Sequence, residues 1–234
     1  MIVSENTGGA AFTPCPAGTY QARCIRLIDM GTQTSDYQGE TKTARKVLMA
    51  FEILDLDVRR DDGTPHIISK RFTASLHEKA ALRKTLASWR GRDFTPIELK
   101  AFDLKAVLGK TCLISLVDNT KDGKTFTNIA AIMAAPKGTT PPEGTCNEPL
   151  MHWDMAAPDW TVFSALPARI VEQIEASPEF KALTPPAGHT SPTRPMQAPA
   201  RPMQAPPPPP APATKPEQAG AGSGFDDMDD DIPF

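Results

Sequence analysis

Proline constrains what this chain can fold into more than any other sequence feature. Most of its 25 prolines lie after residue 140, where 205–210 reads APPPPP and RPMQAPA (194–200) is followed at once by RPMQAPP. A segment so rich in Pro and Ala cannot bury enough apolar surface to offset the entropy lost on ordering. We therefore predict a folded domain over residues 1–138, a helical extension over 139–183 and a disordered Pro/Ala/Gln-rich linker over 184–224. An acidic tip, 225–234, follows the linker.

The charge of the chain is divided in the same way. Residues 1–138 hold 20 Lys and Arg against 15 Asp and Glu, whereas residues 139–234 hold 5 against 13, so a net charge of −3 conceals +5 and −8. A basic head joined to an acidic tail predicts a nucleic-acid partner for the head.

Signatures of enzymes and of membrane proteins are missing from the sequence. It contains no phosphate-binding loop, no HExxH and no GxSxG. The four cysteines form no CxxC pair, which is typical of free thiols in a reducing compartment, and no apolar run reaches the length of about 18–20 residues that spans a bilayer. We predict a non-catalytic protein without cofactor, metal or membrane segment, located in the cytoplasm with the nucleoid.

Alternating apolar residues predict five strands, at 19–30, 45–58, 66–76, 111–118 and 126–134, with a long polar loop over 31–44. A capping box, Ser75-x-x-Glu78, predicts a helix that runs to Gly91, and Thr95-Pro96-x-Glu98 predicts a second, short helix. Five strands with a helical insertion between the third and the fourth favour a mainly β OB-fold, a five-stranded Greek-key barrel. An SH3-like barrel and a β-sandwich are alternatives.

A further helix is predicted over residues 167–180, with Ile170, Val171 and Ile174 as its apolar stripe and a break at Pro178. This helix can dock on its own domain or form a contact in a homo-oligomer.

Binding of single strands without sequence preference needs cations along a groove and aromatic rings for the bases. In an OB-fold these come from the first loop, the strand 2–3 face and the strand 4–5 loop. The sequence places basic and aromatic residues there and after the helix: Tyr37, Lys42, Arg45, Lys46, Lys70, Arg71, Phe72, Arg90, Arg92, Lys121, Lys124 and Phe126. Phe72 and Phe126 are equally compatible with a place in the core.

The chain ends DDMDDDIPF. This end resembles the C-terminal tip of bacterial single-stranded DNA-binding proteins, in which an acidic run closes on Asp-Ile-Pro-Phe. The residues that match are Asp229, Asp230, Asp231, Ile232, Pro233 and Phe234. The head, with GTYQARCIRLIDMGTQ and FDLKAVLGKTCLISLV, looks instead like the divergent single-strand binders of bacteriophages and mobile elements.

The resemblance implies a protein that coats and protects single-stranded DNA in replication, recombination or repair, and that recruits partner enzymes through the tip. In such a tip the phenylalanine fills an apolar pocket of the partner and the aspartates meet its basic rim. A second reading is an adaptor or decoy whose tip engages host replication factors without significant DNA binding.

Overall fold

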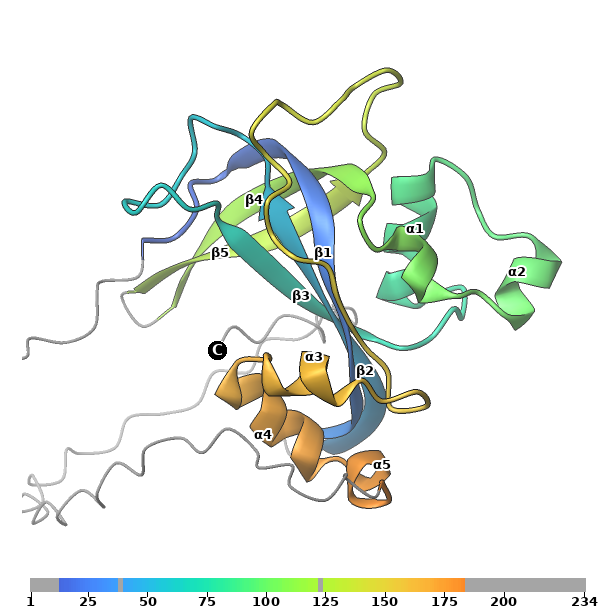
Figure 1. Cartoon of the computed structure of the whole chain (residues 1–234). Helices are drawn as coiled ribbons and strands as arrows, with labels where there is room; N and C mark the ends of the chain where they lie inside the picture. Colours follow the sequence, from blue (N-terminus) through green and yellow to red (C-terminus); the bar gives the residue numbers. More distant parts are fainter. Residues whose placement is uncertain (1–12, 38–39, 122–123, 184–234) are drawn as a thin grey trace, which may run out of the picture.

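The computed structural model describes residues 13–37, 40–121 and 124–183, and the predicted linker and tip lie outside this part of the chain. The described part is mainly β, as the sequence predicts, with a six-stranded sheet and a few short helices (Figure 1). No helix among the described residues is long and apolar enough to cross a bilayer.

Five antiparallel strands follow one another in the order β3-β2-β1-β4-β5. They are β1 (Gly18–Tyr37), β2 (Glu40–Ile53), β3 (Ile67–Thr73), β4 (Thr111–Lys121) and β5 (Lys124–Met133). The two outer strands also approach each other, and the Lys70 Nζ of β3 donates to the Ile129 carbonyl of β5 at 3.1 Å. The sheet therefore curls toward closure, while a short sixth strand, β6 (Met151–Trp153), pairs parallel with β1 at Arg26–Ile28.

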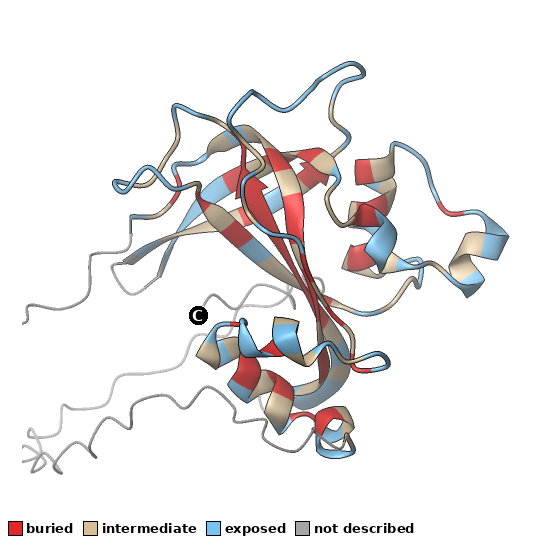
Figure 2. Ribbon diagram, in the orientation of Figure 1, coloured by how far each residue is buried: buried red, intermediate tan, exposed pale blue. Residues whose placement is uncertain are grey.

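Alternation along β2 separates two apolar cores. Val47, Met49 and Phe51 enter the first core, which the inner residues of β1, β3, β4 and β5 complete. Leu48 points to the opposite face and enters the second core. Consecutive residues along the central strands are accordingly coloured as buried in Figure 2.

The segment 31–44 is not the loop that the sequence predicts. β1 continues to Tyr37 and β2 begins at Glu40, with register from Gly31↔Lys46 to Tyr37↔Glu40. We call these two paired segments, 31–37 and 40–46, the ribbon arm. Polar cross-strand contacts support the arm, including Thr34 with Thr43 at 3.4 Å and Thr41 with Asp36 at 2.5 Å. Threonine is a good strand former, so a polar composition does not mark a loop here.

β1 has two irregularities, between Cys24 and Arg26 and between Asp29 and Gly31. Across the first, the alternation shifts, so that Ala22 and Cys24 enter the first core before it and Leu27 enters it after. Gly31 has a φ of 66°, and a Cβ there would lie 2.6 Å from the side chain of Ser177. Glycine at this position thus lets the C-terminal helices approach the strand closely.

Residues 77–110, which we call the helical lobe, connect β3 to β4. The lobe contains α1 (Ala81–Arg90), α2 (Pro96–Lys100) and the 3-10 helix η1 (Leu104–Val107). The inner side of α1 joins the first core, where the Trp89 indole N–H donates to the Thr111 carbonyl at 2.8 Å.

One of the two predicted capping boxes is confirmed. Thr95 and Glu98 cap α2 reciprocally, with a proline at the first position. The prediction that Ser75 and Glu78 cap the first helix is wrong, because α1 begins at Ala81 and its N-cap, Ala80, makes no side-chain hydrogen bond. Ser75 instead accepts the backbone N–H of His77 at 3.2 Å, a local turn that competes with helix formation.

The C-terminal layer consists of β6 and three helices, α3 (Trp160–Ser164), α4 (Ala168–Ala176) and α5 (Pro178–Lys181). The break at Pro178 is confirmed, and the buried Ser177 caps α5 by accepting the Phe180 N–H at 3.3 Å. Val171 and Ile174 pack with Trp153, Phe163 and Ile28 in the second core. The predicted helix therefore docks on its own sheet.

Candidate nucleic-acid interface

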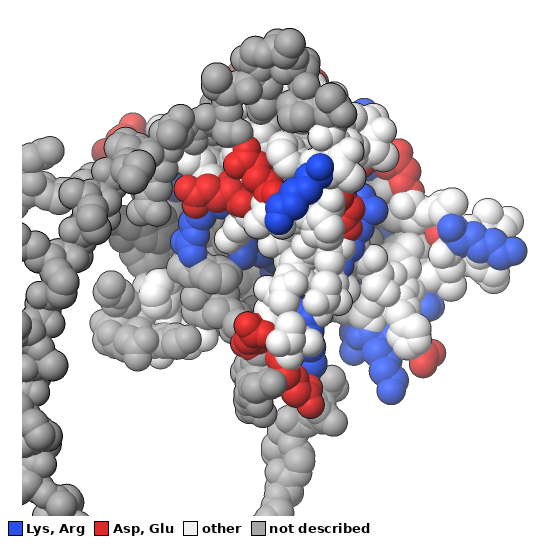
Figure 3. Space-filling model, turned by 90° about the horizontal axis from the view of Figure 1, so that it is seen from below, with Lys and Arg blue, Asp and Glu red and all other residues white. Residues whose placement is uncertain are grey.

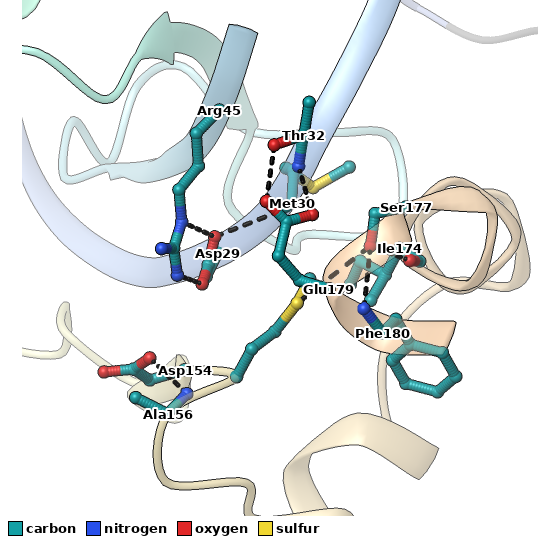
Figure 4. A network of polar contacts seen from close by, with 12 residues as sticks. Asp29, Met30, Thr32, Arg45, Asp154, Ala156, Ile174, Ser177, Glu179 and Phe180 are labelled. Carbon is teal, nitrogen blue, oxygen red and sulfur yellow. Dashed lines mark hydrogen bonds and ion pairs between the residues drawn. The ribbon is translucent and has the colours of Figure 1, made fainter. Parts of the chain in front are cut away.

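The ribbon arm carries three of the predicted cations, and the most constrained of these is Arg45 (Figure 4). Its guanidinium donates to Asp29 through Nε at 3.3 Å and Nη2 at 2.5 Å. The hydrogen bond to Asp29 raises the pKa of Arg45, and the carboxylates of Glu179 and Asp154 add to this effect. Three carboxylates therefore compensate part of the positive charge that Arg45 could offer to a phosphate.

The same network attaches α5 to the arm. Glu179 accepts the backbone N–H of Thr32 at 2.9 Å and also the Thr32 hydroxyl. Next to it, Gln33 Nε2 donates to the Gln173 carbonyl of α4 at 2.9 Å. Thr32 and Gln33, which the sequence predicts to lie in a loop, thus attach the C-terminal layer to the arm.

Two further cations, Lys46 of β2 and Arg71 of β3, lie on the face that α4 approaches. Lys46 pairs in register with Thr73 and its Nζ contacts the Thr73 hydroxyl at 2.9 Å. Arg71 Nη2 donates to Gln173 Oε1 at 2.6 Å. Burial lowers the pKa of Arg71, and the nearby guanidinium of Arg169 lowers it further. Two like charges are therefore held close together between β3 and α4.

Lys70 and Phe72 point to the other face of β3. Lys70 bridges to β5, as described above, and its Nζ lies 5.9 Å from the centroid of the Phe72 ring. Phe72 is 1% exposed and belongs to the first core. This burial argues against the predicted stacking role, because a base would find no free ring face.

Arg90 and Arg92 lie in the helical lobe and share one carboxylate. Both guanidiniums bind Glu98, Arg92 through two hydrogen bonds of 2.9 and 2.8 Å. Arg90 also lies over the rings of Phe94 and Phe102, at 4.6 and 5.0 Å from their centroids. The hydrogen bond from Arg92, together with the Thr95 N–H, holds the pKa of Glu98 far below its usual range. Through Glu98 of α2, these two arginines therefore link the end of α1 to α2.

The hairpin tips hold the remaining candidates. Tyr37 pairs with Glu40 at the end of the arm, and Lys121 pairs with Lys124 at the β4–β5 turn, but these tip side chains lie outside the described part of the chain. Lys42 is exposed on the arm, and Phe126 is half-buried opposite Asn119.

The predicted residues do not all meet on one surface. Lys46 and Arg71 share the face of β2 and β3 that the C-terminal layer adjoins, whereas α1, which carries Arg90, packs on the opposite face through the first core. Arg169 joins Arg71 from α4, and sequence reasoning missed it because only the docking of α4 brings it there. Figure 3 shows both signs of charge on the lower face of the molecule.

Among residues 13–37, 40–121 and 124–183, no group of three or more His, Cys, Asp or Glu side chains could hold a metal ion. A scan against protein-family models finds no family that matches this chain, and a search of curated proteins finds no relative.

Proposed function

We propose that this chain is a non-catalytic single-stranded DNA-binding protein with an OB-fold head and a partner-binding C-terminal tip. The observation that carries the proposal is the strand path β3-β2-β1-β4-β5, with β3 and β5 in contact and a helical connection between β3 and β4. A five-stranded, partly open barrel of this kind uses its strand 2–3 face and its hairpin loops to bind oligonucleotides.

On this proposal the DNA backbone crosses the face of β2 and β3 beside α4. Arg71 and Arg169 repel each other there, and a phosphate between them relieves that repulsion. Lys46 lies two register positions along the same face, and Lys42 lies further out on the arm. Contacts of this kind fix the backbone and read no sequence.

The tip acts as a tethered ligand for other proteins. Phe234 fills an apolar pocket, and Asp229, Asp230 and Asp231 steer the encounter. The linker lets the tip reach a partner while the head stays on DNA, which raises the effective concentration of the partner near the strand.

One observation favours the second function, an adaptor or decoy without significant DNA binding. The described arginines and lysines of β2 and β3 already interact within the molecule, and Arg45 is opposed by three carboxylates. Phosphate contacts at these positions must therefore compete with internal ones.

Fluorescence anisotropy of a labelled oligo-dT separates the two functions. For a DNA-binding head we expect micromolar or tighter binding at 50 mM salt, with an affinity that falls steeply as salt rises. The double variant R71A/R169A should weaken binding about tenfold or more, given a loss of about 1.5–3 kcal/mol when charge-assisted contacts are removed. Absence of binding by the full chain at low salt would reject the proposal in favour of the adaptor.

A further inference from the structure

The helical lobe carries most of the net positive charge of the head. Residues 77–110 contain eight Lys and Arg against four Asp and Glu, a net charge of +4, compared with +5 for the whole of residues 1–138. The structure describes every residue of this lobe, so the state of each charge can be followed.

The arginines of the lobe bind two of its four carboxylates, Asp93 and Glu98. Glu98 binds Arg90 and Arg92, and Asp93 binds Arg83 at 3.0 Å. Asp103 accepts the backbone N–H of Lys105 at the start of η1. Asp103 therefore caps a helix, and Asp93 and Glu98 join segments of the lobe through ion pairs.

Five lysines are left without a partner. Their side chains are exposed, and none of the five Nζ atoms hydrogen bonds or pairs with a carboxylate: Lys79, Lys84, Lys100, Lys105 and Lys110. In Figure 3 basic atoms outnumber acidic ones on the right of the view, over α1 and α2. The lobe thus presents five positive charges that no internal ion pair compensates.

We propose that these lysines bind the phosphate backbone of single-stranded DNA and form a second contact surface beside the sheet. This inference rests on the proposed function. Lysine is a compact, mobile charge that needs no built pocket to bind a phosphate. Release of the counterions condensed on the strand supplies the free energy.

The position of the lobe suits this role. α1 packs against both β3 and β5, the two outer strands of the sheet. Because α1 lies on the face opposite Lys46 and Arg71, a strand that leaves that face reaches the lobe by passing round the edge of β3. The lysines would lengthen the site without adding any preference for a base.

An acidic peptide, such as the tip of this chain, is the alternative ligand for a basic surface. The lysines, however, come from the residues before α1, from α1, α2 and η1 and from the residue before β4, a spread that suits successive phosphates. A peptide anchored by phenylalanine needs an apolar pocket, and Ile97 is the one large apolar side chain that the lobe exposes. The observations therefore favour nucleic acid.

The salt dependence of oligo-dT binding tests this inference. We compare the full-length wild type with K79A/K84A and with K79A/K84A/K100A/K105A. The slope of log K against log salt is negative, and each lost phosphate contact makes it shallower by about 0.7 for single strands. The quadruple variant should thus lose up to about 3 from the slope, and its affinity at 50 mM salt should fall at least tenfold on a long oligomer.

The matched control is K137A/K181A, which removes two exposed lysines outside the lobe that make no ion pair. Its slope should equal that of the wild type, and circular dichroism should show that all variants are folded. Equal slopes for the quadruple variant and the wild type would overturn the inference while the proposed function stands. No binding by the wild type would overturn both.

A further experiment repeats the comparison with residues 226–234 deleted from both proteins. A persistent difference between wild type and quadruple variant supports direct contact with DNA. A difference that vanishes on deletion shows instead that the lysines bind the tip, and it contradicts the inference.

Discussion

The face of β2 and β3 and the helical lobe both carry many cations, yet the two regions use them in opposite ways. On the sheet, Arg45 binds Asp29 of the neighbouring strand β1, and Arg71 binds Gln173 of α4 and so helps to hold the C-terminal layer against the sheet. In the lobe the lysines extend into solvent, and arginines alone make the internal ion pairs. The position of a cation along the sequence is therefore a poor guide to whether its charge is available to a ligand.

The chemistry of the two side chains explains part of this difference. Guanidinium groups are planar and weakly hydrated, so they suit two-point contacts with carboxylates and stacking on rings, as Arg92 and Arg90 show in the lobe. Lysine keeps its hydration more readily and remains at the surface. The comparison can be tested by removing charges of each kind, beginning with the most buried.

The largest effect is expected for Glu52→Ala. Glu52 is 0% exposed and pairs with Arg23 at 2.8 Å, and the Arg23 side chain is only 13% exposed. Removal of one partner leaves a buried charge without compensation, which costs about 3–5 kcal/mol. Urea denaturation measures the free energy of unfolding. A loss below about 1 kcal/mol, the range of exposed ion pairs, would show that Arg23 is not desolvated.

A smaller effect is expected for Glu179→Ala, which removes the contact between α5 and the arm. Burial alone raises the pKa of Glu179, but the hydrogen bonds from Thr32 outweigh it, and the pKa is lowered overall. At pH 7 the variant should lose about 1–2 kcal/mol of stability, since hydrogen bonds to a charged group are removed.

The sign of the pH dependence follows from that lowered pKa. A carboxyl with a folded pKa below its unfolded value of about 4.3 stabilises the fold above that value, and this stabilisation is lost as the pH falls through the folded pKa. The gap in urea midpoint between wild type and variant should therefore be full at pH 7 and narrower at pH 3. A gap that widens in acid would contradict the assigned contact.

The smallest effects on stability are expected for the matched pair Arg45→Ala and Lys84→Ala. Arg45 has a half-exposed side chain in an ion pair, so its removal should cost up to about 1 kcal/mol. Lys84 is exposed and makes no such contact, so the change should stay within about 0.5 kcal/mol. In oligo-dT titrations the order should reverse, with the larger loss of salt dependence for Lys84→Ala. The same order in both assays would remove the distinction between the two regions.

Local signals in the sequence predicted some elements well and others poorly. The Thr95 box predicted α2 because both of its hydrogen bonds form within four residues. The Ser75 box did not predict the start of α1, because a competing turn at His77 uses the same hydroxyl. The ribbon arm was missed since its Thr-rich strands have almost no apolar alternation, and their pairing is carried by the partner strand.

The sequence alone determined the division into a basic head and a proline-rich acidic tail, the mainly β class and the order of five strands around a helical insertion. These properties follow from composition and from alternation over a few neighbouring residues. Tertiary structure decided how each charge is used, because Asp29 meets Arg45, and Arg169 meets Arg71, only when β1 pairs with β2 and α4 docks on the sheet. Such contacts join residues up to 147 positions apart, as Thr32 and Glu179 are, and no local pattern encodes them.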